Sequence, residues 1–105
     1  MYGYTMHVPA PIEAYQALHK AVMEVIAEHG GGEGLVLHLA YATDRGFDLT
    51  EVWESREQLG AFNQDVFPKA MARAGVSMDG PEPEILEFEP AGVMTPGGYS
   101  SDAAT

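Results

Sequence analysis

The first eight residues alternate large side chains with small or polar ones. The large side chains are Tyr2, Tyr4, Met6 and Val8. A repeat of two residues is typical of a β-strand with one buried face, so the pattern predicts a strand over residues 1–8.

A long helix is predicted to follow this strand. Pro9 and Pro11 cannot continue a strand ladder, whereas proline fits the first turn of a helix, so we expect the helix to begin near Pro11. Its buried stripe follows a spacing of three and four residues. The stripe comprises Ile12, Tyr15, Leu18, His19, Val22, Val25, Ile26 and His29. Three glycines at residues 30–32 end the helix.

The next two segments indicate a β-hairpin. Residues 34–42 are apolar at nearly every position, which is typical of a strand buried on both faces, although periodicity alone also permits a buried helix. A length of nine residues bounded by glycine favours the strand. Turn-forming residues at 43–46 lead into a second β-rich segment at 47–55.

A second helix and a fourth strand are predicted next. Ser55 is the expected helix cap, and Gln58 completes a capping-box pattern. The inner stripe comprises Leu59, Phe62, Val66, Ala70 and Met71. We expect a distortion at Pro68, which interrupts the hydrogen-bond ladder, and an end at Gly75. Residues 84–88 alternate apolar residues with glutamates and predict a short edge strand.

These elements predict one α+β domain over residues 1–90, of the ferredoxin-like βαββαβ type with a four-stranded antiparallel sheet. Residues 91–105 are rich in Gly, Pro, Ser, Asp and Ala and are expected to form a flexible tail. Both faces of the strand at 34–42 carry apolar side chains, but helices cover only one. We therefore expect a homodimer that meets sheet to sheet.

Charge and composition limit the kinds of molecule that this protein is expected to bind. Sixteen carboxylates against five basic residues give a net charge of -11, which repels phosphate backbones and anionic lipid, so neither nucleic acid nor membrane is expected as a partner. No apolar run approaches the roughly 20 residues of a membrane span, and a cytoplasmic location is expected. The absence of cysteine leaves chemistry to histidines, carboxylates, hydroxyl groups and aromatic rings.

His38 and Glu51 are the leading candidates for acid–base chemistry. A four-residue turn at 43–46 sets them opposite each other, and a histidine–carboxylate pair in a cleft can serve as a general base. A three-residue turn shifts the register by one position and separates them. The alternative is a buried histidine satisfied by a neighbour.

His19 lies on the inner stripe of the first helix, with Tyr15 one turn earlier. It is a candidate for orienting a ligand, against the alternative of a core or rim residue. The four histidines are far apart in sequence, so no metal site is expected. Haem held by one axial histidine is a further alternative. Trp53, two residues from Glu51, either walls a pocket for a flat aromatic ligand or fills a core with its N–H bonded.

The segment EVWES at 51–55, followed by REQL at 56–59 and a helical Phe62, resembles the antibiotic biosynthesis monooxygenase family of the dimeric α+β barrel superfamily. The similarity is best over residues 35–75. The resemblance implies protomers that meet sheet to sheet, with a pocket between sheet and helices that Trp53 lines.

Strand alternation then turns three further residues toward that pocket, namely Phe47, Leu49 and Glu51. Two leucines, Leu49 and Leu59, stand where such enzymes tend to carry polar pocket residues, and Phe62 stands where relatives frequently have histidine. The characterised monooxygenases of the family oxidise polycyclic phenols or quinols with O₂ and need neither metal nor flavin, so the resemblance implies no cofactor.

Two functional hypotheses follow. The first is a cofactor-independent, oxygenase-like enzyme for an aromatic substrate, in which Trp53 stacks on the substrate, Glu51 with His38 withdraws a phenolic proton, and His19 orients the substrate. The second is a non-catalytic dimeric domain that binds a small apolar ligand or a partner, with the same residues serving as packing.

Overall fold

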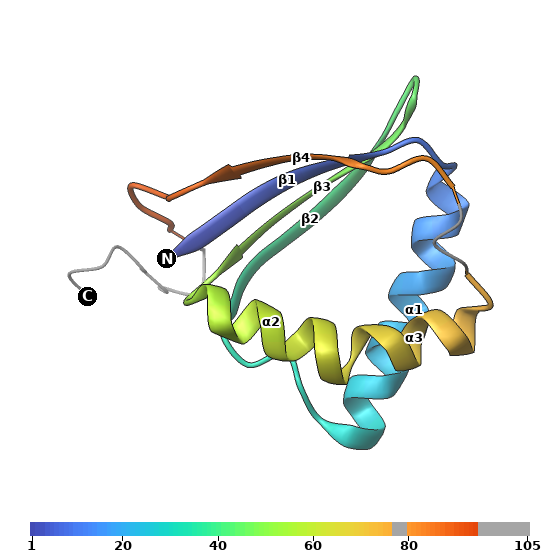
Figure 1. Ribbon diagram of the computed structural model, residues 1–105, viewed down its shortest axis with the longest axis horizontal. Helices are drawn as coiled ribbons and strands as arrows, with labels where there is room; N and C mark the ends of the chain where they lie inside the picture. Colours follow the sequence, from blue (N-terminus) through green and yellow to red (C-terminus); the bar gives the residue numbers. More distant parts are fainter. Residues whose placement is uncertain (77–79, 95–105) are drawn as a thin grey trace.

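The computed structural model describes residues 1–76 and 80–94, and it has the predicted order of strands and helices with one additional break (Figure 1). The elements are β1 (Tyr2–Val8), α1 (Ile12–His29), β2 (Leu35–Thr43), β3 (Gly46–Trp53), α2 (Arg56–Asp65), α3 (Phe67–Ala74) and β4 (Glu84–Phe88). The strands form one antiparallel sheet in the order β2-β3-β1-β4. This arrangement confirms the ferredoxin-like α+β fold and the edge position of β4.

The second helix is two helices, which corrects the prediction of a single distorted one. The chain leaves α2 at Val66 and re-enters a helix in α3, whose first turn contains Pro68. Proline has no N–H to donate and its ring clashes with the carbonyl four residues earlier, whereas the first turn of a new helix tolerates it. The predicted cap is present, since the backbone N–H of Gln58 donates to Ser55 Oγ at 3.2 Å. Gly75 ends α3 with a left-handed φ of 69°.

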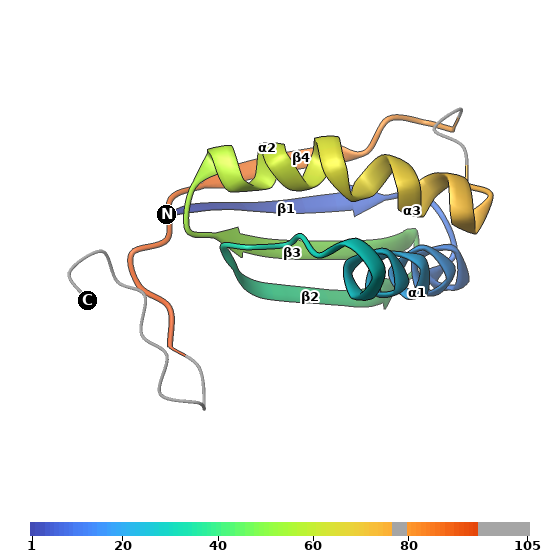
Figure 2. The same ribbon diagram turned by 90° about the horizontal axis from the view of Figure 1, so that it is seen from below.

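All three helices lie on one side of the sheet (Figures 1 and 2). Both α1 and α2 contact the sheet at β3, whose helix-facing side chains are all buried. These side chains are Phe47, Leu49, Glu51 and Trp53. A second buried cluster joins α1 to α3 and contains Ala21, Val25, Val66 and Ala70. None of the helices in the described ranges is long and apolar enough to cross a membrane.

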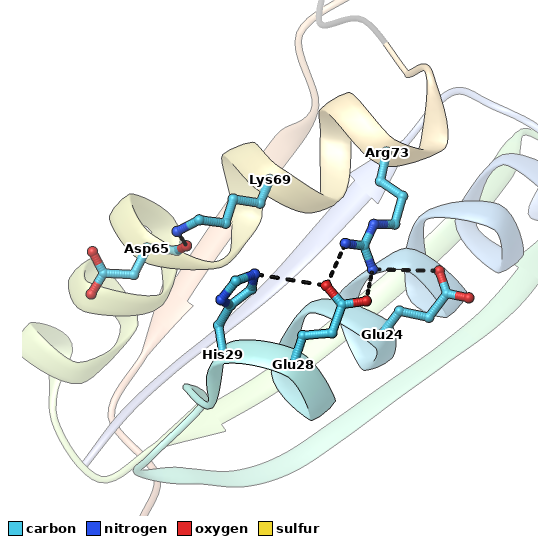
Figure 3. A network of polar contacts seen from close by, with 6 residues as sticks. All are labelled: Glu24, Glu28, His29, Asp65, Lys69 and Arg73. Atoms are coloured by element: carbon cyan, nitrogen blue, oxygen red, sulfur yellow. Dashed lines mark hydrogen bonds and ion pairs between the residues drawn. The ribbon is translucent and has the colours of Figure 1, made fainter.

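Ion pairs at the surface also link α3 to α1 (Figure 3). The Arg73 guanidinium donates to both carboxylate oxygens of Glu28, at 2.9 and 2.7 Å, and lies 3.9 Å from Glu24. His29 Nε2 lies 3.7 Å from Glu28. Lys69 of α3 donates to the backbone carbonyl of Asp65, the last residue of α2, at 2.9 Å. Because water and salt screen such exposed pairs, the buried cluster beneath them contributes more to stability.

The sheet face opposite the helices carries large exposed apolar side chains. Exposed fractions range from 37% for Leu37 and Phe88 to 70% for Leu86, with Leu39 and Tyr41 between them. A homodimer stays a prediction, and this outer face is the surface that a second copy would cover. The predicted tail at 91–105 lies outside the described residues from position 95 onward.

The cluster between α1 and α3 predicts an asymmetry between two residues of α1. Val25 is 1% exposed and Met23 is 54% exposed. We expect Val25→Ala to lower the free energy of unfolding by about 2 kcal/mol, because it removes buried methyl groups and leaves a cavity. Met23→Ala is the control and should change it by less than about 0.5 kcal/mol. Urea titration measures both, and equal losses would contradict the assigned core.

Candidate functional site

The turn between β2 and β3 sets the register of the hairpin. Thr43 pairs with Gly46, and the ladder then pairs His38 with Glu51. Gly46 has a φ of 141°, and a Cβ at this position would lie 2.0 Å from the carbonyl oxygen of Val8. Only glycine fits there. The pairing of Thr43 with Gly46 leaves a two-residue connection, and this length brings His38 and Glu51 together.

Glu51 is a buried carboxylate at the centre of a row of residues across the sheet. It pairs with His38 on β2 and with Tyr4 on β1, and its exposed fraction is 5%. Tyr4 Oη donates to Oε1 of Glu51 at 2.6 Å, and the indole N–H of Trp53 donates to the same oxygen at 3.0 Å. The other oxygen, Oε2, lies 2.5 Å from Nδ1 of His38. Both oxygens are therefore satisfied without water.

These contacts keep Glu51 ionised. Burial raises the pKa of its carboxyl, but hydrogen bonds from His38, Tyr4 and Trp53, together with the electrostatic attraction of His38, outweigh burial and hold the pKa below its ordinary value. An ionised carboxylate only accepts hydrogen bonds, so Nδ1 of His38 carries a proton. The Nε2 atom of a neutral His38 is then an acceptor that faces away from Glu51.

Two residues of α1 extend the contacts from His38. Tyr15 Oη lies 2.5 Å from His38 Nε2 and 3.2 Å from His19 Nδ1. The three rings are nearly parallel, with centroids 5.4 to 5.8 Å apart. Burial and then the charge of Glu51 raise the pKa of the Tyr15 phenol, which therefore stays protonated and donates to His38. We call the chain of Glu51, His38, Tyr15 and His19 the His38 relay.

The His38 relay has the parts of a general base. The carboxylate fixes the tautomer of the imidazole and stabilises the imidazolium that forms when Nε2 takes a proton. Glu51 is buried, whereas the side chain of His38 is 25% exposed and those of Tyr15 and His19 are partly exposed. The relay thus runs from the interior toward solvent between α1 and β2.

The other predicted pocket residues lie beside the relay. The Trp53 indole is fully buried, with its ring centroid 5.5 Å from that of Phe62. With no exposed surface, this indole cannot meet a ligand in the present conformation, and it holds Glu51 in place instead. Phe47 packs against Tyr15 at 5.5 Å between ring centroids. Leu49 is buried on the same face of β3, and Leu59 is partly buried on α2.

Sequence reasoning missed Tyr4 as a site residue. The alternation in residues 1–8 placed Tyr4 on the same face of the strand as Tyr2 and Met6. It did not show which strand lies next to this one, because α1 and β2 separate β1 from β3 along the chain. The register of such a non-local pair is not encoded in a single turn, so the contact with Glu51 came only from the structure.

Two surface depressions, of about 420 and 360 Å³, lie away from the His38 relay. The larger is formed by residues 9–12 and 42–46, and the other includes His7, Arg45 and Glu84. Within residues 1–76 and 80–94, no group of three His, Asp or Glu side chains is arranged to hold a metal ion. The relay is therefore the strongest candidate for chemistry in the part of the chain that the structure describes.

Fold and site together define a ferredoxin-like α+β protein with a carboxylate–histidine pair beneath its helices. No protein-family model and no curated protein sequence matches the chain. Solved structures with the same fold include an antibiotic biosynthesis monooxygenase, with a TM-score of 0.57 and 11% identity over 86% of this chain and 98% of the other.

Two further structures share the fold. A conserved protein from Methanosarcina mazei Go1 has a TM-score of 0.55 and 18% identity over 83% of this chain and 89% of that one. Rv0793 from Mycobacterium tuberculosis has a TM-score of 0.50 and 18% identity over 85% of this chain and 92% of that one. At these identities the similarity concerns the fold, and in that sense it confirms the resemblance drawn from residues 51–59.

The contacts of Glu51 predict the effect of removing a donor. We expect Tyr4→Phe to lower the free energy of unfolding at pH 7 by about 1.5 to 2 kcal/mol, because a buried carboxylate loses a charged hydrogen bond. Tyr41→Phe is the control, since Tyr41 is an exposed tyrosine whose hydroxyl lies 3.3 Å from Asp48, and it should cost less than about 0.5 kcal/mol.

The same pair of variants tests the pH dependence. The folded-state pKa of Glu51 lies below its ordinary value of 4.5, so between these values the unfolded chain binds more protons. The contribution of Glu51 is complete above pH 4.5 and is lost as the pH falls through the folded-state pKa. In Tyr4→Phe the free energy of unfolding should fall less steeply as the pH is lowered, which urea titrations from pH 3 to 7 measure. An unchanged slope would contradict the role of Tyr4.

Proposed function

We propose that the protein is a small-molecule enzyme resembling cofactor-independent monooxygenases, with a phenol or quinol as substrate. In this reaction His38 removes the phenolic proton, and O₂ then oxidises the electron-rich anion to a quinone. One oxygen atom of O₂ is retained in the quinone and the other leaves as water. The observation that supports it most directly is the short contact between His38 Nε2 and a phenolic hydroxyl, that of Tyr15, at 2.5 Å.

Tyr15 indicates how a substrate would sit. Its hydroxyl is placed where His38 Nε2 accepts a proton and where His19 Nδ1 is 3.2 Å away. A substrate phenol that takes the place of this hydroxyl meets the same two nitrogens. His38 then removes the proton, and His19 donates a hydrogen bond to the anion and so orients it. Glu51 stabilises the imidazolium form of His38.

The overall charge and fold agree with this class of substrate. A net charge of -11 favours a neutral aromatic ligand over an anionic one. The fold is shared with a solved antibiotic biosynthesis monooxygenase, although the catalytic proposal depends on the His38 relay rather than on that likeness.

The catalytic proposal predicts the loss of O₂ uptake on removal of the base. With a panel of polycyclic phenols and quinols, His38→Gln should lower kcat by at least about 100-fold, because general-base catalysis contributes that much. His29→Gln, which replaces an exposed histidine at the end of α1, should leave kcat unchanged. An oxygen electrode measures both, and equal rates in the two variants would exclude His38 as the base.

The second candidate is a non-catalytic dimeric domain. It is favoured by the mutual satisfaction of the polar groups in the His38 relay and by the full burial of Trp53. Absence of O₂ uptake across the panel, with unaltered folding, would support it. A Soret band on haem titration that His19→Ala abolishes would instead indicate a haem-binding protein.

We also propose that the outer face of the sheet pairs two copies of the chain. Leu39, at 50% exposure, lies on this face at the middle of the edge strand β2. Leu39→Lys should convert a dimer to a monomer, because it places a charge in an apolar interface. Met23→Lys makes the same charge change on an exposed part of α1 and should leave the dimer intact. Light scattering after gel filtration measures the mass, and a monomeric unaltered protein would refute the pairing.

A further inference from the structure

Two imidazole nitrogens from different elements converge on one point beside the sheet. His38 Nε2 from β2 and His19 Nδ1 from α1 both lie within hydrogen-bond distance of a single atom, Tyr15 Oη. The three ring systems are parallel to within 23°. Sequence spacing does not predict this convergence, because it depends on how α1 crosses β2.

His19 Nδ1, His38 Nε2 and Tyr15 Oη are atoms of the kind that coordinate divalent transition metals. Imidazole nitrogen is a ligand for Zn²⁺, Ni²⁺ and Cu²⁺, and a phenolic oxygen adds a third donor. Ligands about 2.0 Å from a tetrahedral ion are about 3.3 Å from one another. The separation of Tyr15 Oη from His19 Nδ1 is 3.2 Å and already fits, whereas the 2.5 Å separation from His38 Nε2 would have to lengthen by somewhat under 1 Å.

Glu51 supplies the support that metal-binding histidines require. A ligating imidazole commonly donates its second N–H to a carboxylate, which fixes the ring and strengthens the ligand. His38 has this arrangement, with Nδ1 at 2.5 Å from Glu51 Oε2. The carboxylate is in turn fixed by Tyr4 and Trp53, so the orientation of the His38 ring is set before any ion arrives.

We propose that His19 Nδ1, His38 Nε2 and Tyr15 Oη form a binding site for a divalent transition-metal ion, with Glu51 as the supporting carboxylate. The ion takes the place of the hydrogen bonds that join the three rings, and waters complete its coordination. The proton on His19 Nδ1 moves to Nε2 of the same ring, and the phenolic proton that Tyr15 shares with His38 is released to solvent as the ion binds. A bound ion occupies the nitrogen that acts as base in the proposed reaction, so it inhibits that reaction.

Calorimetric titration of the metal-free protein with ZnCl₂ tests the site without any substrate. We expect one ion per chain, with Kd weakened at least about 10-fold in His19→Gln and in His38→Gln, since loss of a ligand costs no less than loss of an outer-shell partner. Glu51→Gln should weaken Kd by roughly 10- to 100-fold. His29→Gln replaces an exposed histidine of α1 outside the site, so it should bind as tightly as the unaltered protein.

Copper gives a structural readout that a general loss of stability would not produce. The electron paramagnetic resonance spectrum of the protein with one equivalent of CuCl₂ should show coupling to two nitrogens, reduced to one in His19→Gln. In Tyr15→Phe the spectrum should still show coupling to two nitrogens, but its g values and copper hyperfine splitting should change. No binding by the unaltered protein, equal binding in every variant, or loss of binding in His29→Gln alone would overturn the site.

The metal site and the catalytic proposal fail separately. Zinc binding that depends on His19 and His38 without O₂ uptake would leave the site standing and the enzyme refuted. O₂ uptake that depends on His38 but is unaffected by ZnCl₂, with no zinc binding, would leave the enzyme standing and refute the site.

Discussion

The burial of one ionised carboxylate constrains the rest of this structure. Glu51 sits on β3, the strand that both α1 and α2 contact, where water is nearly excluded. A charge there is tolerated only if each oxygen has donors close by. The donors come from three strands, with Tyr4 on β1, His38 on β2 and Trp53 on β3 itself. The indole orientation and the histidine tautomer follow from this requirement, and the sheet register is the one that satisfies it.

The requirement also explains why the chemistry lies where it does. Oε1 of Glu51 is taken by two neutral donors, so only Oε2 remains for a histidine. The histidine is on β2, an edge strand, which lets its far nitrogen point from the interior toward α1. The buried charge of Glu51 is thereby connected, through His38, to the partly exposed rings of Tyr15 and His19. The carboxylate of Glu51 is thus shielded from water, while the imidazole of His38 stays partly exposed to a ligand.

Local patterns predicted most of the fold because each element carries its own signal. Alternation marked β1 and β4, a nearly continuous apolar run bounded by glycine marked β2, and β-rich composition after a turn marked β3. Three- and four-residue spacing marked α1, and the Ser55 cap marked the start of α2. The break at Val66 was underestimated, because a proline can be accommodated by a kink or by a new helix, and the choice depends on packing against α1. Pairing of His38 with Glu51 followed from the turn length. The contact of Tyr4 with Glu51 did not, since it joins strands that are distant along the chain.

The two-residue connection at Asp44 and Arg45 has a consequence for how this chemistry is inherited. An inserted residue there that shifts the pairing by one position would leave both strands and the sheet order intact, yet it would separate His38 from Glu51. A lineage could therefore gain or lose the relay through a single codon while its fold stayed recognisable. Proteins that share this architecture at 11 to 18% identity are best compared first by the length of that hairpin, before any activity is transferred between them.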